Sequence, residues 1–468
     1  VIAYGDFLTQ SQYLLASYAN EIINEVLDNI DISNTEYAAI TAGSRPAPQV
    51  DGSAQTLAPC GNSASDCDAG EFLMTAVTFS NVDTAFSHGS GQGTTVNMDN
   101  FAVTDARSAC FNFAENTVAT LTGSASAPST MTRCNTNNIW WGGAIVSTPG
   151  SSAGSLTMSY VDISESYVSG IRTDLKTVSI DNVDIVNTNS QYPIREYTDA
   201  SGNTVTVPVG DQVWQKSGVS LEFDHAGPGS QITISDFSAP GYHHGRICST
   251  GTISLTNVDL GTGLGPAADG SWTNYEDYFD IKSADNNGCG GSSIGTFGAD
   301  STFNNFDVGN LYISATFPSV MSQMDIDGEL IFSGLTVAGA PTDPIMMNDV
   351  SIADKFEVNT CSANIEASNI ATPLVKSACN VPGGMNFLTM KDSTIAHTDT
   401  FLSAIEMEQT RGTMIDVAVT STTINSNGPY IAYGMYDSDM YLVEVTLNGD
   451  NCADNTLGMS TTCHVGKA

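Results

Sequence analysis

The sequence is poor in basic residues and has no long apolar run. Only 14 of its 468 residues are Lys or Arg, against 51 Asp or Glu, so the formal net charge is −37. A field of this sign repels the phosphates of nucleic acids and anionic membrane surfaces, so we expect neither as a partner. No stretch approaches the roughly 18 consecutive apolar residues of a membrane-spanning helix. We therefore expect no membrane span.

Two further scarcities narrow the class of protein. Charged residues make up only 14% of the chain and hydrophobic residues 41%, a composition that excludes an acidic disordered tail and permits a packed core. No Asn-x-Ser/Thr acceptor site is present, so N-glycosylation is not expected. What is abundant is glycine, with 43 residues, together with Ser, Thr and Asn. This composition is typical of a turn-rich β protein.

The ten cysteines lack the close spacing of zinc sites. An even number favours disulfides, which indicates an extracellular or cell-surface location, whereas buried free thiols in a cytosolic protein are the alternative. Pairing each cysteine with its nearest neighbour predicts five local bridges, namely Cys60–Cys67, Cys110–Cys134, Cys248–Cys289, Cys361–Cys379 and Cys452–Cys463.

An eight-residue pattern recurs along the chain. LTMSYVDI (156–163) and VSIDNVDI (178–185) begin 22 residues apart, and ISLTNVDL (253–260) fits the same frame. The frame is apolar at positions one, three, six and eight. Each pair of apolar positions has the period of a strand, but the step from three to six is odd. A bend between them is needed to turn both pairs toward one core.

Position five of the frame is where the bend is expected. The most common residue there is asparagine, which tolerates left-handed backbone angles better than most non-glycine residues. We therefore predict that each copy is a strand, a one-residue corner and a second strand. The corner asparagines are Asn81, Asn100, Asn182, Asn257, Asn305 and Asn369.

Copies about 22 residues long predict a parallel solenoid, since no unit can bury its apolar face without stacking on its neighbours. Over residues 71–450 this gives an all-β parallel β-helix of roughly 16 coils. A β-sandwich also has alternating strands and is the alternative fold, although it does not need asparagine at a fixed frame position.

The strand–asparagine–strand copies VSIDNVDI and ISLTNVDL resemble the right-handed parallel β-helix of the pectate-lyase-like superfamily. The resemblance implies that the corner asparagines stack into a hydrogen-bonded ladder. It also implies a right-handed winding, which agrees with the usual chirality of parallel crossovers.

Residues 1–70 are interpreted as an N-terminal helix followed by a linker rich in Gly, Ser and Pro. Within 6–30, Asp6 can cap a helix on which Leu15, Tyr18, Ile22 and Val26 form one apolar stripe. We expect this helix to cover the open edge of the first coil. A helix that docks a partner is the alternative.

Two segments are expected to depart from the solenoid. A hairpin is predicted near 189–217, where REYTDASGNTVTVPV turns at Ser201, Gly202 and Asn203. Residues 451–468 are predicted to form a tail closed by the last cysteine pair. This tail folds over the edge of the last coil, or that edge stacks on another molecule, or the native chain is longer.

Rare ionisable residues cluster in LEFDHAG (221–227) and PGYHHGRIC (240–248). Carboxylates and imidazoles there could act as acid and base on a polysaccharide, with an arginine binding a uronate. Histidines in exposed loops are the alternative. GYHHGRI resembles the GHG and RIK motifs of polygalacturonase-like enzymes, but their paired aspartates are missing. The candidate catalytic residues are Asp224, His225, His243, His244 and Arg246.

The segment MDIDGE brings together Asp325, Asp327 and Glu329, whose oxygens are the ligands that Ca²⁺ prefers. Turns rich in Asp and Asn have the same appearance without a metal. The fold requires no cofactor, and Ca²⁺ is the candidate ion because it also reduces the self-repulsion of an acidic chain.

These features favour an extracellular structural protein that associates with itself. It would be a subunit of a cell-surface layer, sheath or filament, or an adhesive stalk, assembling through uncapped coil edges. One alternative is a polysaccharide lyase or glycoside hydrolase on the same fold. Another is a glycan-binding adhesin or tail-fibre module, for which cell-surface glycans are the partner.

Overall fold

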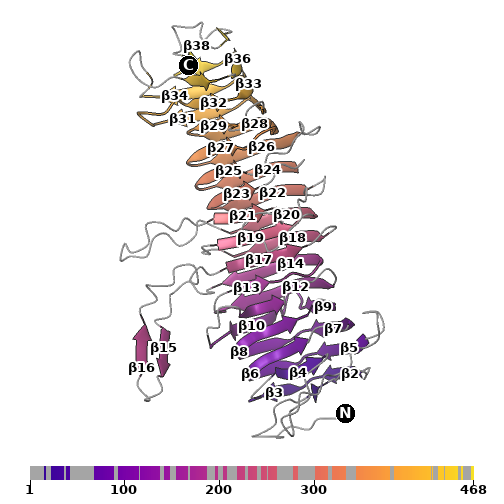
Figure 1. Ribbon diagram of the computed structural model, residues 1–468. Coiled ribbons are helices and arrows are strands. Elements are labelled where there is room, and N and C mark those ends of the chain that lie inside the picture. Colours follow the sequence, from indigo (N-terminus) through magenta and orange to yellow (C-terminus); the bar gives the residue numbers. More distant parts are fainter. Residues whose placement is uncertain are drawn as a thin grey trace, which may run out of the picture. The chain divides into compact units, whose positions relative to one another are not determined.

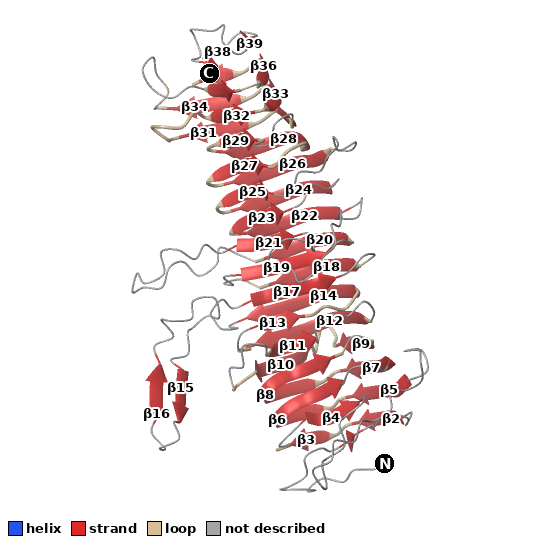
Figure 2. Cartoon of the chain, in the orientation of Figure 1, coloured by secondary structure: helices blue, strands red, loops and turns tan. Residues whose placement is uncertain are grey.

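The protein is seen here in a computed structural model. The residues it describes are 15–16, 23–35, 38–42, 68–88, 93–114, 116–137, 142–147, 154–166, 169–186, 195–198, 204–207, 219–226, 230–239, 244–249, 251–260, 278–282, 301–314, 319–333, 344–379, 384–422, 424, 431–436, 438–448, 450–451, 455–456 and 465–467. In these ranges every regular element is a strand and none is a helix (Figure 2). The all-β fold class is therefore confirmed.

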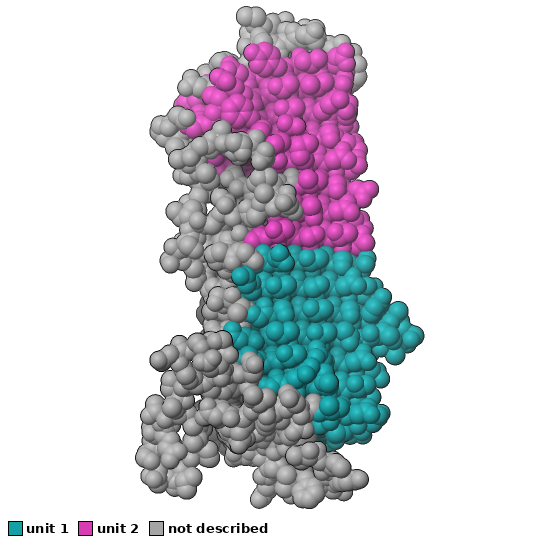
Figure 3. Space-filling view, turned by 90° about the vertical axis from the view of Figure 1, so that its right-hand side faces the viewer, with its two compact units in different colours: residues 1–248, 266–273 teal, residues 249–265, 274–468 magenta. Residues whose placement is uncertain are grey.

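The chain divides into two compact units (Figure 3). Unit 1 comprises Val1–Cys248 and Pro266–Thr273, and unit 2 comprises Ser249–Gly265 and Asn274–Ala468. Within each unit, parallel strands stack on one another in a solenoid-like arrangement (Figure 1). The stacked parallel strands that the repeat predicts are therefore present in each unit.

Unit 1 contains three parallel stacks of strands. The strands before the corner are β2, β5, β7, β9, β12, β14 and β18. Those after it are β3, β6, β8, β10 and the second halves of β12 and β14. The third stack is β1, β4, β6, β8, β11, β13 and β17. The bounds are β1 Leu15–Ala16, β2 Ile23–Asp28, β3 Asp31–Ser33, β4 Ala38–Ala42, β5 Asp68–Thr75, β6 Thr78–His88, β7 Gly93–Asp99, β8 Ala102–Phe113, β9 Thr117–Thr122, β10 Ser129–Cys134, β11 Gly143–Ser147, β12 Ser155–Ser164, β13 Ser169–Arg172, β14 Thr177–Val186, β17 Val219–Ala226, β18 Gln231–Ser238 and β19 His244–Ser249.

Unit 2 repeats the arrangement. Each of the strands β20, β22, β24, β26 and β28 continues through the corner, so its first half lies before the corner residue and its second half after it. Beyond β28 the two halves are separate strands. The stack before the corner continues with β30, β33 and β36, and the stack after the corner continues with β31, β34 and β37. The third stack is β21, β23, β25, β27, β29, β32, β35 and β40. The bounds are β20 Thr252–Asp259, β21 Tyr278–Lys282, β22 Ser301–Val308, β23 Asn310–Ser314, β24 Ser319–Ile326, β25 Glu329–Ser333, β26 Ile345–Ile352, β27 Lys355–Asn359, β28 Asn364–Thr372, β29 Val375–Ala378, β30 Asn386–Lys391, β31 Thr394–His397, β32 Ile405–Glu408, β33 Thr410–Ile415, β34 Ala418–Ser421, β35 Ala432–Met435, β36 Asp439–Val443, β37 Thr446–Leu447, β38 Asp450–Asn451, β39 Asn455–Thr456 and β40 Val465–Lys467.

The core is built from the apolar positions of the repeat. In β14, Val178, Ile180, Val183 and Ile185 occupy positions one, three, six and eight, and all four side chains are buried. The residues between them point outward or lie at the corner. Two strand-period pairs thus face the same core despite the odd step between them, because the chain bends at position five.

The bend is a left-handed corner, as the frame predicts. All six corner asparagines have φ angles between 51° and 54°. The side chains bond across neighbouring strands, with Asn305 Nδ2 donating to Asn257 Oδ1 at 3.0 Å and Asn81 Nδ2 to Asn34 Oδ1 at 2.7 Å. In unit 2 the same column continues through Gln323, Asp349, Asn369, Asp392, Asp416 and Glu444, all with positive φ.

In unit 1 the corners form two columns rather than one. Asn100 and Asn182 lie in the first, whereas Asn81 lies in the second with Asn34 and Asp105. The eight-residue frame cannot separate them, because the two corners of one strand pair are only five residues apart, as at Ala76 and Asn81. Because both corners are flanked by apolar residues at similar positions, copies of the same eight-residue frame can be centred on the first corner or on the second.

The expected N-terminal helix over 6–30 is wrong for the part of this segment that the structure describes. Leu15–Ala16 and Ile23–Asp28 are strands, and β2 pairs in parallel with β5. Val26, assigned to the apolar helical stripe, is 70% exposed, whereas its neighbour Leu27 is buried. The stretch is another copy of the repeat, since Asn29 has a φ of 51° at position five. Pairing along a whole strand outweighs the weak helix propensity of a short amphipathic segment.

Two departures from the stacks match the expected places. β15 (Arg195–Thr198) and β16 (Thr204–Val207) form an antiparallel hairpin within 189–217. At the C-terminal end, β39 pairs antiparallel with β36, β38 antiparallel with β37, and β40 in parallel with β35. The described residues after Leu447 thus pair with the edge of the preceding strands, whereas the Cys452–Cys463 pair expected to close the tail lies outside the described residues.

Candidate functional site

The candidate catalytic residues lie on neighbouring strands of unit 1. Asp224 and His225 are on β17, and His244 and Arg246 begin β19, which pairs with β17. His243 lies outside the described residues. The backbone therefore brings the two motifs together, as stacking predicts. The side chains of the other four lie outside what is described, so their chemistry stays a prediction.

The candidate calcium ligands do not converge. Asp325 is the next-to-last residue of β24, Asp327 is in the following turn, and Glu329 begins β25. Glu329 faces a basic residue instead, with its Oε1 3.1 Å from Lys355 Nζ. Among the described residues, no group of three or more His, Cys, Asp or Glu side chains is arranged to hold a metal ion.

Glu329 belongs to a chain of ion pairs on the third stack of unit 2. Lys355 Nζ lies 2.8 Å from Glu357 Oε2, and Lys376 Nζ lies 3.6 Å from Glu357 Oε1. Burial alone lowers the pKa of Lys355, but hydrogen bonds to Glu357 and Glu329 outweigh it and raise the pKa. In-register pairing of β25, β27 and β29 places these residues side by side. The eight-residue frame does not extend to the third stack, so the repeat does not predict these ion pairs.

An acidic row follows the corner in unit 2. Asp259, Asp307 and Asp325 are opposite one another on β20, β22 and β24. Burial, followed by repulsion from Asp259, Asp327 and Asp325, raises the pKa of Asp307 to about 6. Its Oδ1 is buried without a hydrogen-bond partner. An unpaired buried carboxylate oxygen is costly when ionised.

A similar row lies in unit 1, where Asp162 and Asp184 are opposite each other on β12 and β14. Burial, then repulsion from Asp184, raises the pKa of Asp162. These aspartates occupy position seven of the frame, as Asp259 and Asp307 do in unit 2. The recurring Asp at this position is a signal in the sequence that could have identified both rows.

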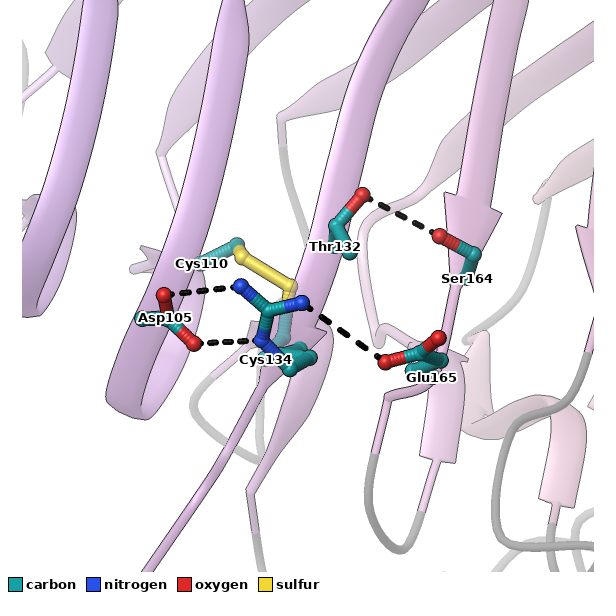
Figure 4. Close-up of polar contacts among 7 residues, drawn as sticks. Asp105, Cys110, Thr132, Cys134, Ser164 and Glu165 are labelled. Atoms are coloured by element: carbon teal, nitrogen blue, oxygen red, sulfur yellow. Dashed lines mark hydrogen bonds and ion pairs between the residues drawn. A yellow bond between two sulfur atoms is a disulfide. The ribbon is translucent and has the colours of Figure 1, made fainter.

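The second corner column of unit 1 carries charged side chains from Asp105 onward, and Figure 4 shows this charged part of the column. Arg133 lies between Asp105 and Glu165, which belong to the neighbouring strand and to the turn after β12. Its Nη1 is 3.8 Å from Glu165 Oε2. Beside this group, the Thr132 and Ser164 hydroxyls are 3.1 Å apart. The column is therefore held by side chains that reach from strand to strand.

Two of the five expected cysteine pairs are disulfides in the structure. Cys110 is bonded to Cys134, and Cys361 to Cys379. Each joins segments separated by 24 or 18 residues, close to one repeat. The other three pairs, Cys60–Cys67, Cys248–Cys289 and Cys452–Cys463, each include cysteines outside the described residues.

Comparison with known proteins adds no relative. No family model matches the chain, and neither the curated proteins nor the solved structures contain a significant match. In the described part of the chain, no helix is long and apolar enough to cross a membrane.

Proposed function

We propose that this chain is an extracellular structural protein, a subunit of a cell-surface layer, sheath or filament, or an adhesive stalk. Its fold would be a right-handed parallel β-helix of roughly 16 coils, similar to that of the pectate-lyase-like superfamily. The observation that carries the proposal is the in-register parallel stacking within both units, which sets outward side chains directly opposite one another from strand to strand.

Covalent bonds support a role outside the cell. The disulfides Cys110–Cys134 and Cys361–Cys379 each connect neighbouring repeats. Disulfides persist in oxidising compartments and add about 2–4 kcal/mol each by restricting the unfolded chain. A stapled solenoid resists unfolding and proteolysis, which suits a protein that stays at a surface.

Self-association would use sheet faces rather than the C-terminal coil edge. That edge is paired with β38, β39 and β40. In unit 2, Val320 and Met346 are opposite each other on β24 and β26 and are 50% and 42% exposed. Tyr441 on β36 is 57% exposed. Exposed apolar side chains on a regular sheet face favour lateral contacts between copies.

Calcium ions would assist this association. The net charge of −37 makes two copies repel each other, and the acidic row of unit 2 presents the exposed carboxylates of Asp259 and Asp325 at the surface of the stack. Divalent cations screen such repulsion and can bridge carboxylates of two molecules. Ca²⁺ would thus act between molecules, without a closed site in one chain.

Negative-stain microscopy and sedimentation of the purified chain, in calcium and in chelator, test the proposal. We expect ordered polymers in calcium, and fewer in chelator. The variant Val320→Lys/Met346→Lys should reduce assembly, whereas Thr394→Lys, at an exposed position of β31 in the stack after the corner, serves as a control for the added charge. A chain that stays monomeric in both conditions and degrades a uronate polymer would instead be a polysaccharide-cleaving enzyme.

A further inference from the structure

One face of unit 1 carries a two-dimensional array of hydroxyl groups. On β9, β12, β14 and β18, the residues Thr120, Thr157, Ser179 and Thr233 are directly opposite one another and point outward. The outward rows on either side, two residues before and two residues after, are also mainly Ser and Thr. The exceptions are Val118, Gln231 and Asp181. We call these three rows the hydroxyl face.

The spacing of the hydroxyl face is set by the backbone. Parallel strands lie about 4.8 Å apart, and alternate residues on a strand are separated by about 6.6 Å. Both repeats are comparable with the oxygen spacings on the faces of an ice crystal. Hydroxyl groups donate and accept hydrogen bonds as water does, so the array offers partners to a water lattice in two directions.

The charge of the hydroxyl face also fits a neutral partner. The chain as a whole carries −37 charges, yet Asp181 is the single ionisable residue of the three rows over these strands. Its Oδ1 accepts a hydrogen bond from Ser235 Oγ at 2.5 Å, and its Oδ2 accepts one from Asn182 Nδ2 at 2.8 Å. An anionic partner would find no positive charge in these rows, and a cationic partner would find one carboxylate that already accepts two hydrogen bonds, whereas uncharged water needs no opposite charge.

The array is rigid because the alternate residues are locked in the core. Ala119, Met158, Ile180 and Ile234 lie between the outward residues and are 0–1% exposed. Short Ser and Thr side chains lose little rotamer entropy when they are ordered. A preorganised surface therefore binds an ordered lattice with a small entropy cost.

From these observations we infer that the hydroxyl face binds the surface of ice. The partner is a crystalline water lattice, and this goes beyond the structural role proposed above. A crystalline neutral polysaccharide also has hydroxyl repeats, but sugar rings usually stack on aromatic side chains. None of the three rows over β9, β12, β14 and β18 contains an aromatic residue.

Ice affinity of the full chain tests the inference. Fluorescently labelled protein should accumulate on a growing ice crystal, slow ice recrystallisation and separate the freezing point from the melting point. Thr157→Lys places a long charged side chain in the middle of the face and should reduce ice affinity more than about tenfold. The matched control Thr389→Lys in unit 2 should bind ice like the wild type.

Further variants distinguish the loss of ice binding at the hydroxyl face from a failure of the protein to fold. Thr233→Lys on the neighbouring strand provides a second disruption if Thr157→Lys does not fold, and circular dichroism with thermal melting identifies folded variants. Absence of ice binding by the wild type overturns the inference, as does equal binding by folded Thr157→Lys and Thr233→Lys. Retention on crystalline cellulose or chitin powder without ice binding also overturns it, in favour of a neutral glycan.

Discussion

Arg133 and Asp105 face each other at left-handed corners of neighbouring strands and are joined by two hydrogen bonds, from Nε to Oδ1 at 2.5 Å and from Nη2 to Oδ2 at 2.9 Å. At the preceding level of the same column, the side-chain amide of Asn81 donates a hydrogen bond from Nδ2 to Oδ1 of Asn34. A bidentate guanidinium–carboxylate pair thus replaces an amide pair without changing the backbone corner. The corner requires a backbone angle and a cross-strand partner, and several side chains can provide the partner.

Replacing Arg133 tests the strength of this pair. Arg133→Gln should lower stability by about 0.5–1 kcal/mol at neutral pH, since both side chains are about two-fifths exposed and water screens the charges. The hydrogen bonds from Arg133 lower the pKa of Asp105. The stabilisation is therefore present above the unfolded pKa of about 3.9 and is lost as the pH falls through the folded pKa. Thermal melting at pH 7 and pH 2.5 measures the difference, which should shrink in acid.

The more exposed pair of Arg411 and Asp439, whose charged atoms are 3.7 Å apart, provides the control. Arg411→Gln should have a smaller effect than Arg133→Gln at pH 7. If Arg411→Gln and Arg133→Gln lowered the stability equally, the two-bond geometry of the Arg133–Asp105 pair would make no extra contribution to stability.

Asp307 is expected to make the stability of unit 2 depend on pH in the opposite direction. Its folded pKa of about 6 is above the unfolded value, so ionisation of this carboxyl group destabilises the folded state relative to the unfolded state. Stability should fall as the pH rises from about 4 to 7. Asp307→Asn removes the charge and should stabilise the protein at pH 8 by about 1 kcal/mol, a value reduced for solvent screening, with no gain at pH 4.

Melting curves of Asp307→Asn between pH 4 and pH 8 measure this effect. The exposed Asp354 provides the matched control, because Asp354→Asn removes the same carboxylate charge without touching the acidic row. A gain from Asp307→Asn that is equal at both ends of the range would rule out ionisation as its cause.

The left-handed corner predicts a graded series at Asn305, whose φ is 52°. Asn305→Gly keeps the angle accessible but loses the bond to Asn257, which costs about 1 kcal/mol. Asn305→Val loses the bond and adds about 1–2 kcal/mol of left-handed strain, so it should be the least stable variant. Thermal melting should rank wild type above Gly, and Gly above Val. Equal stability of the two variants would show that the angle carries no strain.

The Cys361–Cys379 disulfide closes a short loop in unit 2. Cys361→Ser/Cys379→Ser should lower stability by about 3 kcal/mol, because the bond restricts the unfolded chain. Reduction of the wild type should cause at least this loss, because it also opens Cys110–Cys134, and reduction should cost the double variant less than it costs the wild type. Peptide mapping under non-reducing conditions identifies the pairing, and a different partner for Cys361 would contradict the structure.

The repeat made the core and the corners predictable. Val178, Ile180, Val183 and Ile185 are buried where the frame requires, since strand period and a fixed bend leave no other arrangement. The N-terminal segment was misassigned because Leu15, Ile22 and Val26 satisfy a helical period by chance. The copy around Asn29 lies in the same stretch, and its pairing with β5 decides the structure.

The polar contacts were harder to predict. Glu329, Lys355 and Glu357 come together only through the register of β25 and β27, which the frame does not determine. The grouping of Asp325, Asp327 and Glu329 as calcium ligands stays a prediction, but the structure gives Glu329 another partner for a related reason. Neighbours in sequence at the end of a strand point in different directions, so Glu329 bonds to the next strand.

The pairing of β38, β39 and β40 with β37, β36 and β35 occupies backbone groups at that edge of unit 2. An unpaired edge strand exposes N–H and C=O groups to which another chain can bond. The added strands therefore protect this edge of the sheet from unintended strand addition.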